Sequence, residues 1–261
     1  SPFAFTGNKF EFRMVPSSCS ISGPNFVLNT IVAEALSEMA DRLEKAEDFN
    51  SELQSLLKDI VSSHKRIIFN GNNYSEEWIK EAEKRGLPNI TNTVDATIAL
   101  IKEKNIKVFE KHGVLNKTEL SSRCEIILET YIKTINIEAL TMLEMAKRQI
   151  LPAVIRYTGS IASTIASIKS TGLNVDTSVQ SDLLQEVSTR LTELKKKITE
   201  LEKATCDASN FSGDTYDHAV MYRDVVLAKM NELRAIADQL ETIVDEGVWP
   251  FPTYGQLLFD I

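Results

Sequence analysis

The sequence predicts a mainly α protein, in which long antiparallel helices form a bundle that follows one or two short strands. Three observations support this prediction. Glycine and proline are few, at 10 and 7 of 261 residues, and aromatic residues make up only 7%, which favours long helices over many short strands and turns. Apolar residues recur every three or four positions through most of the chain after residue 116. Strict alternation of apolar and polar residues is limited to a short stretch near residue 10.

Composition also excludes several functional classes. The chain is 43% hydrophobic and 25% charged, an ordinary globular balance that allows one large or two modest cores. Its formal net charge of -8 repels phosphates, so we expect neither nucleic acid nor an anionic membrane as a partner. No apolar run approaches the roughly 18 residues of a membrane span, and we recognise no signal peptide. The three cysteines are widely spaced and indicate a reduced, cytoplasmic setting rather than a disulfide framework.

The alternating stretch covers residues 10–15. Two phenylalanines and a methionine point to one face, while Glu11 and Arg13 point to the other. A single strand can neither bury its apolar face nor pair its own backbone, and RIIFN at 66–70 is the only other candidate strand. We therefore expect the partner strands to precede residue 1, so that the chain begins inside a folded domain. Residues 15–25, VPSSCSISGPN, are predicted to form a loop.

The next part of the chain predicts several helices. Helical spacing of apolar residues predicts one helix over residues 25–57. Ser75 is predicted to cap a helix that Gly86 ends. Residues 91–99 are predicted to form a short helix, and a second one runs on to Gly113.

A very long helix is predicted over residues 117–170. Asn116 and Glu119 have the spacing of a capping box at its start, with asparagine where serine or threonine is usual. Pro152 lies inside this stretch. Because proline removes one backbone donor, we expect it to kink the helix rather than end it.

Two further helices carry narrow apolar seams. Thr177 and Gln180 match a capping box before the first, whose leucines, valine and isoleucine step by three and four over residues 184–201. TCDASNFSGDT at 205–215 is predicted to be a loop, and the second seam covers 230–244 before Gly247 ends the helix. We interpret both seams as packing within the chain, with contacts between subunits as the alternative. The tail WPFPTYGQLLFDI, residues 249–261, is apolar and should dock on another part of the protein.

Other reactive side chains have ordinary explanations. His64, His112 and His218 share no metal-binding spacing, so we expect surface or capping roles. Cys124 lies on an apolar helix and is predicted to be a core thiol, whereas Cys206 is predicted to be a loop thiol. From the residues alone, Glu11 and Arg13 would form an ion pair on a solvated sheet.

Several motifs together change that interpretation, because they resemble the glutamine synthetases. SPFAFTGNKFEFRMV and GPNFVLNTIVAEAL resemble the last part of the catalytic domain. HKRIIFNGNNYSEEWIKEAEKRGLPN, EALTMLEMAKRQILPA and WPFPTYGQLLF resemble the long type III form found in bacteria. The resemblance implies that residues 1–30 end the catalytic domain, that 31–116 are its helical end, and that 117–261 form a long-helix bundle with a docking tail. The strands would then be left over from an incomplete α+β catalytic domain.

The resemblance also implies roles for the charged pair. In this family a Glu-x-Arg strand lines the active site, so Glu11 would be a ligand of Mg²⁺ or Mn²⁺, and Arg13 would contact ATP and neutralise the transferred phosphoryl group. Carboxylate oxygen suits these ions, and cations stabilise phosphoryl transfer. The other metal-binding glutamates, the histidine and the other arginines of the family have no counterpart in this sequence.

Two functions follow. The first is the carboxyl-terminal portion of a glutamine synthetase, a ligase that uses ATP to join ammonia to glutamate through a γ-glutamyl phosphate. We expect this portion to be inactive alone and to bind ATP and metal poorly, and the resemblance implies a homo-oligomer of stacked rings. The alternative is a non-catalytic helical module for interaction or oligomerisation, in which residues 1–30 are a remnant.

Overall fold

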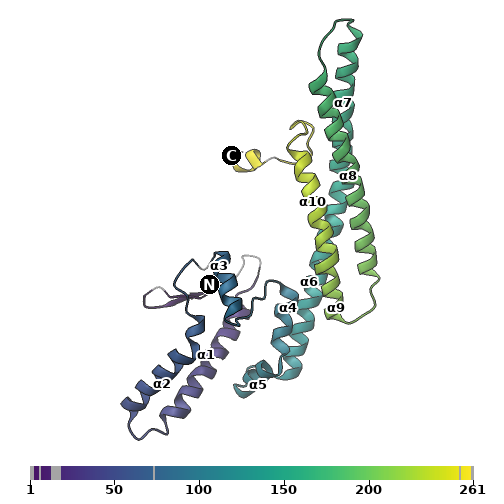
Figure 1. The fold of residues 1–261 in the computed structure, drawn as a ribbon. Coiled ribbons are helices and arrows are strands. Elements are labelled where there is room, and N and C mark those ends of the chain that lie inside the picture. The colour runs from purple at the N-terminus through teal and green to yellow at the C-terminus, as the bar shows by residue number, and fades with distance from the viewer. Residues whose placement is uncertain (1–2, 6, 13–18, 73, 253, 260–261) are drawn as a thin grey trace. The chain divides into compact units, whose positions relative to one another are not determined.

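The computed structural model describes residues 3–5, 7–12, 19–72, 74–252 and 254–259. The chain divides into two compact units, Ser1–Cys124 and Glu125–Ile261, which are described separately below. Helices dominate both units (Figure 1), so the prediction of a mainly α fold is confirmed. No helix among the described residues is long and apolar enough to cross a membrane. The domain boundaries implied by the resemblance stay predictions.

The first unit opens with a β-hairpin. Strand β1, Phe3–Phe5, pairs antiparallel with β2, Phe10–Phe12, and Ala4 lies opposite Glu11. Gly7 has a φ of 96°, a conformation that glycine adopts without steric cost. The expectation that the strand finds its partner only before residue 1 is therefore wrong, because β1 supplies one inside the chain.

Two other local predictions in this unit also need correction. The sequence RIIFN could have been a small strand or a packed loop, and it is not a strand: Lys65–Ile67 form a 3₁₀ turn, η1. The predicted loop at 15–25 ends earlier than expected, because helix α1 already begins at Ser22. The part of the predicted strand and loop at residues 13–18 lies outside the described residues.

A helical hairpin replaces the single helix predicted over residues 25–57. Helix α1 spans Ser22–Leu43 and α2 spans Phe49–His64. Asp48 sets the break between the two helices. Its backbone is extended, and its side chain accepts a hydrogen bond from the Asn50 amide at 3.1 Å, so the second helix begins directly after it. Apolar periodicity alone misses such a break, because it continues across the turn.

Three short helices complete the first unit: α3, Glu76–Lys84; α4, Thr93–Ile98, followed by the 3₁₀ turn η2, Ala99–Ile101; and α5, Glu103–Lys111. Gly86 and Gly113 follow α3 and α5 with φ of 68° and 63°, so both predicted stops are confirmed. Ser75 does precede α3, but its hydroxyl donates to the Asn72 carbonyl at 2.8 Å and does not cap the helix.

The core of the first unit lies where α5 and the start of the next helix, α6 (Lys117–Met145), meet the apolar side of α1. Ile106, Phe109 and Leu120 are buried there, with Phe26 and Val27 packed against them. Cys124 is also buried, and its thiol faces the Thr97 carbonyl at 3.8 Å. The predicted core position of this cysteine is confirmed.

The long helix predicted over residues 117–170 is confirmed. It consists of α6, Lys117–Met145, a π-helical turn η3, Ala146–Ile150, and α7, Leu151–Ser170. The capping box forms in both directions: the Asn116 amide donates to Glu119 at 2.8 Å, and the Glu119 amide donates to the Asn116 side chain at 2.9 Å. Pro152 is the second residue after this wide turn, which accommodates the missing donor and the crowded carbonyl.

The remaining helices are α8, Ser178–Ser209; α9, Thr215–Met221; the π-helical turn η4, Tyr222–Val226; α10, Leu227–Glu241; and α11, Tyr254–Phe259. Three boundaries differ from prediction. Thr177 precedes α8 without capping it, and Asp176 instead accepts a bond from the Ser178 amide at 2.9 Å. Helix α8 continues through Cys206, which is exposed on its last turn and not in a loop. Helix α10 ends at Glu241, before Gly247.

The core of the second unit is built by residues of α6, α7, α8 and α10. Helix α8 packs against α7 on one side and α10 on the other (Figure 1). The seam residues Leu194 and Ile198 of α8 and Leu240 of α10 are completely buried. The interpretation of the seams as packing within the chain is therefore confirmed.

The apolar tail docks only in part. Trp249 is 8% exposed and belongs to the core of the second unit, and Phe251 packs against that core. Leu257 and Leu258 of α11 remain 66% and 72% exposed. The docking prediction thus holds for the start of the tail and not for the two leucines.

Candidate functional site

The sequence-predicted site begins at Glu11 on β2. Its side chain is 34% exposed, and its Oε1 lies 4.0 Å from the Nζ of Lys9, whose side chain is 68% exposed. Arg13, the other predicted site residue, lies outside the described residues. The structure therefore shows Glu11 as an accessible carboxylate on a short hairpin and leaves its relation to Arg13 a prediction.

The described residues do not form a divalent metal site by themselves. Mg²⁺ demands octahedral oxygen coordination. Within the described ranges, no three His, Cys, Asp or Glu side chains converge as metal ligands would. Glu11 offers one carboxylate, and the Lys9 ammonium beside it opposes a bound cation. A metal at this hairpin would need ligands from beyond the described residues.

The histidines lie apart in structural positions. His112 Nε2 bonds Glu34 at 2.6 Å, and Lys111 Nζ bonds the same carboxylate at 2.8 Å. Hydrogen bonds from Lys111 and then His112 lower the pKa of Glu34, and the Glu34 carboxylate raises the pKa of Lys111. This cluster joins α5 to α1. His218, in the second unit, contacts the Ala208 carbonyl at 2.9 Å.

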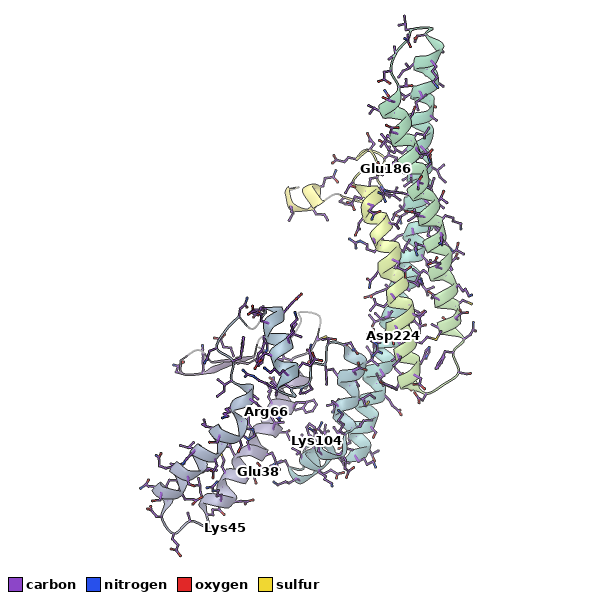
Figure 2. All side chains as sticks on the ribbon, in the orientation of Figure 1. Glu38, Lys45, Arg66, Lys104, Glu186 and Asp224 are labelled. Atoms are coloured by element: carbon purple, nitrogen blue, oxygen red, sulfur yellow. The ribbon has the colours of Figure 1, made fainter. Side chains whose placement is uncertain are left out.

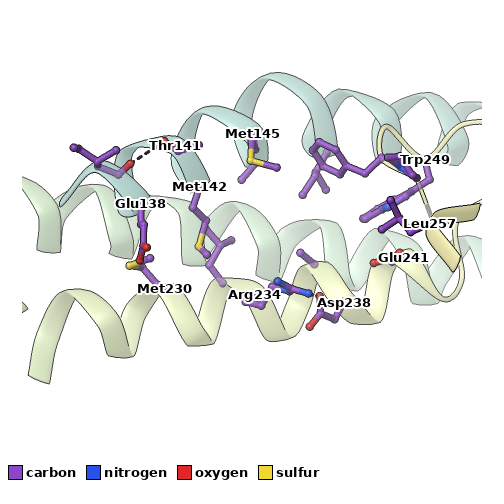
Figure 3. Close-up of a pocket in the computed structure, with 17 residues that line it drawn as sticks. Glu138, Thr141, Met142, Met145, Met230, Arg234, Asp238, Glu241, Trp249 and Leu257 are labelled. Atoms are coloured by element: carbon purple, nitrogen blue, oxygen red, sulfur yellow. Dashed lines mark hydrogen bonds and ion pairs between the residues drawn. The ribbon is translucent and has the colours of Figure 1, made fainter. Parts of the chain in front are cut away.

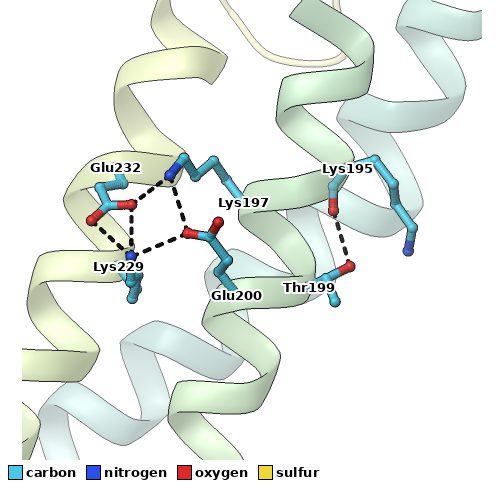
Figure 4. A network of polar contacts seen from close by, with 6 residues as sticks. All are labelled: Lys195, Lys197, Thr199, Glu200, Lys229 and Glu232. Atoms are coloured by element: carbon cyan, nitrogen blue, oxygen red, sulfur yellow. Dashed lines mark hydrogen bonds and ion pairs between the residues drawn. The ribbon is translucent and has the colours of Figure 1, made fainter.

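A second charged cluster, which we call the α8–α10 network, consists of Lys197, Glu200, Lys229 and Glu232 (Figure 4). Each lysine contacts both carboxylates: Lys197 reaches Glu232 at 2.7 Å and Glu200 at 3.1 Å, and Lys229 reaches them at 3.0 Å and 3.1 Å. Charges of both signs alternate around the ring and satisfy each other. The arrangement ties α8 to α10 and leaves no charge available for chemistry.

This network makes stability depend on pH in a defined direction. Hydrogen bonds from Lys197 and Lys229 lower the pKa of Glu232 from 4.5 to about 2. A lowered folded-state pKa means that the contribution is fully present above pH 4.5 and is lost as the pH falls toward 2. We expect Glu232→Gln to flatten the acid side of the stability curve in that window, measured by urea unfolding. An unchanged acid side of the curve would contradict the role of the network. Glu186→Gln, at an exposed position of α8 outside the network (labelled in Figure 2), is the control.

The second unit also contains a pocket that sequence reasoning missed. It has a volume of about 570 Å³ and lies between α6, α10 and the docked tail (Figure 3). Its apolar lining includes Met142, Met145, Met230 and Trp249. These residues span more than a hundred positions of sequence, so only the folded chain brings them together. The methionine pair in α6 and the aromatic tail were the available signals.

Comparison with known proteins gives consistent results. Residues 52–169 match the profile of the glutamine synthetase C-terminal domain. Over 266 residues the chain is 37% identical to a type-3 glutamine synthetase of Dictyostelium discoideum, an alignment that covers 99% of this chain and 36% of that protein. It is 34% identical to a glutamine synthetase of Butyrivibrio fibrisolvens and 30% identical to one of Bacteroides fragilis (strain YCH46), over 100% and 99% of this chain and 37% and 36% of those proteins.

The chain thus spans a little over a third of the length of the curated relatives it matches, at 36% and 37% of each. The alignments with the relatives extend over essentially the whole chain and therefore include the β-hairpin that carries Glu11. The resemblance noted from the motifs is confirmed by these matches.

Proposed function

Since this chain is a relative of the glutamine synthetases and carries their C-terminal domain, we propose that it supplies part of a type III glutamate–ammonia ligase. The reaction joins ammonia to the side-chain carboxylate of glutamate at the expense of ATP. That carboxylate attacks the γ-phosphorus of ATP, and ADP leaves. Ammonia then attacks the acyl carbon of the γ-glutamyl phosphate, phosphate leaves, and the nitrogen loses a proton.

The observation that carries this proposal is the extent of the similarity. It covers 99% of the chain at 37% identity and includes the hairpin as well as the helices. We propose that Glu11 is a ligand of a Mg²⁺ or Mn²⁺ ion and that Arg13 contacts the phosphoryl group of ATP. Residues two apart on a strand share a face, which supports placing both groups toward one ligand.

The chain alone is proposed to be inactive. Among the described residues, Glu11 belongs to no group of three or more His, Cys, Asp or Glu side chains placed to hold a metal. Phosphoryl transfer depends on several cations arranged around the transferred group. The remaining ligands of ATP, glutamate and metal must therefore come from other parts of the enzyme.

We also propose that the enzyme is a cytoplasmic homo-oligomer of stacked rings. Large apolar side chains remain exposed on α6 of the second unit, where Ile126, Ile137 and Leu140 are 60%, 63% and 52% accessible. Such surface favours coverage by other protein segments. It also fits the second candidate, a helical interaction module without catalytic function.

The experiment compares two purified proteins, the full-length product of the gene that encodes this chain and the 261-residue chain. Glutamine formation from glutamate, ammonia and ATP is measured in the presence of Mg²⁺ or Mn²⁺. We expect activity from the full-length product and none from the chain. A full-length product without activity would favour the interaction module, and glutamine formation by the chain alone would overturn its assignment as an incomplete part.

A further inference from the structure

The pocket of the second unit has the size of a small-molecule site. Its volume is about 570 Å³, within the range of roughly 300–1,000 Å³ that ligand pockets occupy. Helix α6 forms one wall, α10 forms the other, and the tail closes one end with Trp249 (Figure 3). All of these elements belong to the same compact unit.

Flexible apolar side chains line the pocket. Met142, Met145 and Met230 project into it from both walls (Figure 3). Methionine is unbranched and polarisable, so it adapts to ligands of irregular shape. The Thr141 hydroxyl already donates to the Ile137 carbonyl at 2.8 Å, which leaves the walls with little capacity for specific polar contacts. The interior of the pocket therefore favours a ligand whose buried part is apolar.

The rim of the pocket carries excess negative charge. Its charged residues are Glu138, Asp238, Glu241 and Arg234, three carboxylates against one guanidinium, for a formal charge of -2. Arg234 forms an ion pair with Asp238, with 2.5 Å between Nε and Oδ1. The side-chain carboxylates of Glu138 and Glu241 form no hydrogen bond or ion pair with any described residue.

The two unpaired carboxylates lie at different places on the rim. Glu138 comes from α6, next to Met230, and Glu241 comes from α10, beside Trp249 and Leu257 (Figure 3). Glu241 is half-buried, so a cation beside it would experience less screening by water than on an open surface. Trp249 lines the same end of the pocket, and indole rings attract cations placed over their faces.

We propose that this pocket binds a small apolar molecule that carries one ammonium group. The apolar body lies between α6 and α10 against the methionines, and the ammonium pairs with Glu241 at the end closed by Trp249. Neither the pocket nor the ligand class takes part in the proposed ligase reaction, so a binding experiment tests this inference independently of the proposed function.

Decylamine is the probe, and decanol and decanoate are its neutral and anionic matches, all used below their micelle concentrations with the full-length protein. Isothermal titration calorimetry measures affinity. Fluorescence of Trp249 reports the site in a Trp78→Phe background, which removes the other of the two tryptophans of this chain; any tryptophan elsewhere in the full-length protein is replaced too. We expect saturable binding of decylamine, about tenfold tighter than decanol, with a change in Trp249 emission.

Glu241→Gln is expected to remove most of the preference for decylamine over decanol. Glu125→Gln is the matched control, since Glu125 is an exposed acid of α6 outside the pocket, and it should bind decylamine like the parent. The proposal is overturned if decanol or decanoate binds as tightly as decylamine, if Trp249 does not respond at saturation, or if Glu125→Gln weakens binding as much as Glu241→Gln.

Discussion

Replacing Glu11 with alanine in the full-length protein is expected to lower kcat for glutamine formation by about 100-fold or more. Loss of groups that only orient a metal ligand already costs roughly 10–100-fold, and loss of the ligand itself costs at least as much. Glu11→Asp keeps a carboxylate but moves it, so it should retain partial activity that rises with Mn²⁺ concentration. Both variants are measured under saturating glutamate and ATP across a metal titration.

Lys9 provides the control for this prediction. Its Nζ lies 4.0 Å from Glu11 Oε1, and a surface pair of this kind contributes little to stability. If Glu11 served only as the partner of Lys9, Lys9→Ala and Glu11→Ala would have equally small effects on activity. We expect Lys9→Ala to retain most of the activity. Equal effects of the two variants would eliminate the metal-ligand role.

The second large effect concerns stability. Leu194→Ala is expected to lower the free energy of unfolding of the second unit by about 3 kcal/mol, within the 2–5 kcal/mol that such truncations cost. Leu194 is completely buried on the face of α8 that belongs to the core cluster. Neighbouring helices cannot close a cavity in the middle of a 32-residue helix without shifting along its length.

Leu173→Ala is the matched control, because it removes the same atoms from a side chain that is 70% exposed in the loop before α8. We expect a change within about 0.5 kcal/mol. In a Trp78→Phe background, urea unfolding followed by Trp249 fluorescence reports on the second unit, where that tryptophan is 8% exposed. Similar losses for the two leucine variants would mean that the seam is not a packed core.

The candidate site divides into a part that sequence reasoning found and a part that it did not. Glu11 was singled out because alternation over a few residues shows which side chains share a strand face, and the metal role proposed for it comes from the family resemblance. The pocket was missed because its walls come from α6, α10 and the tail. No local pattern relates Met142 to Met230, since their proximity follows from how the helices pack.

Helix boundaries divide in the same way. The capping box at Asn116 and the stop at Gly86 were predicted correctly, because both depend on hydrogen bonds and backbone dihedrals within a few residues. The break at Asp48 was missed. Strand β1 was also missed, because it is only three residues long and is defined by its pairing with β2. Its sequence, FAF, carries too little pattern to be recognised alone.

The sequence by itself determined the mainly helical class, the long helix that ends at Ser170, the apolar seams and the resemblance to the glutamine synthetases. These depend on periodicity, capping residues and motifs, which are local or inherited properties of the chain. Only the tertiary structure decided which seams meet, how Lys197 and Lys229 share two carboxylates, and where an apolar pocket remains between α6 and α10. Those features depend on side chains far apart in sequence, and their energies arise only when packing brings the side chains into contact.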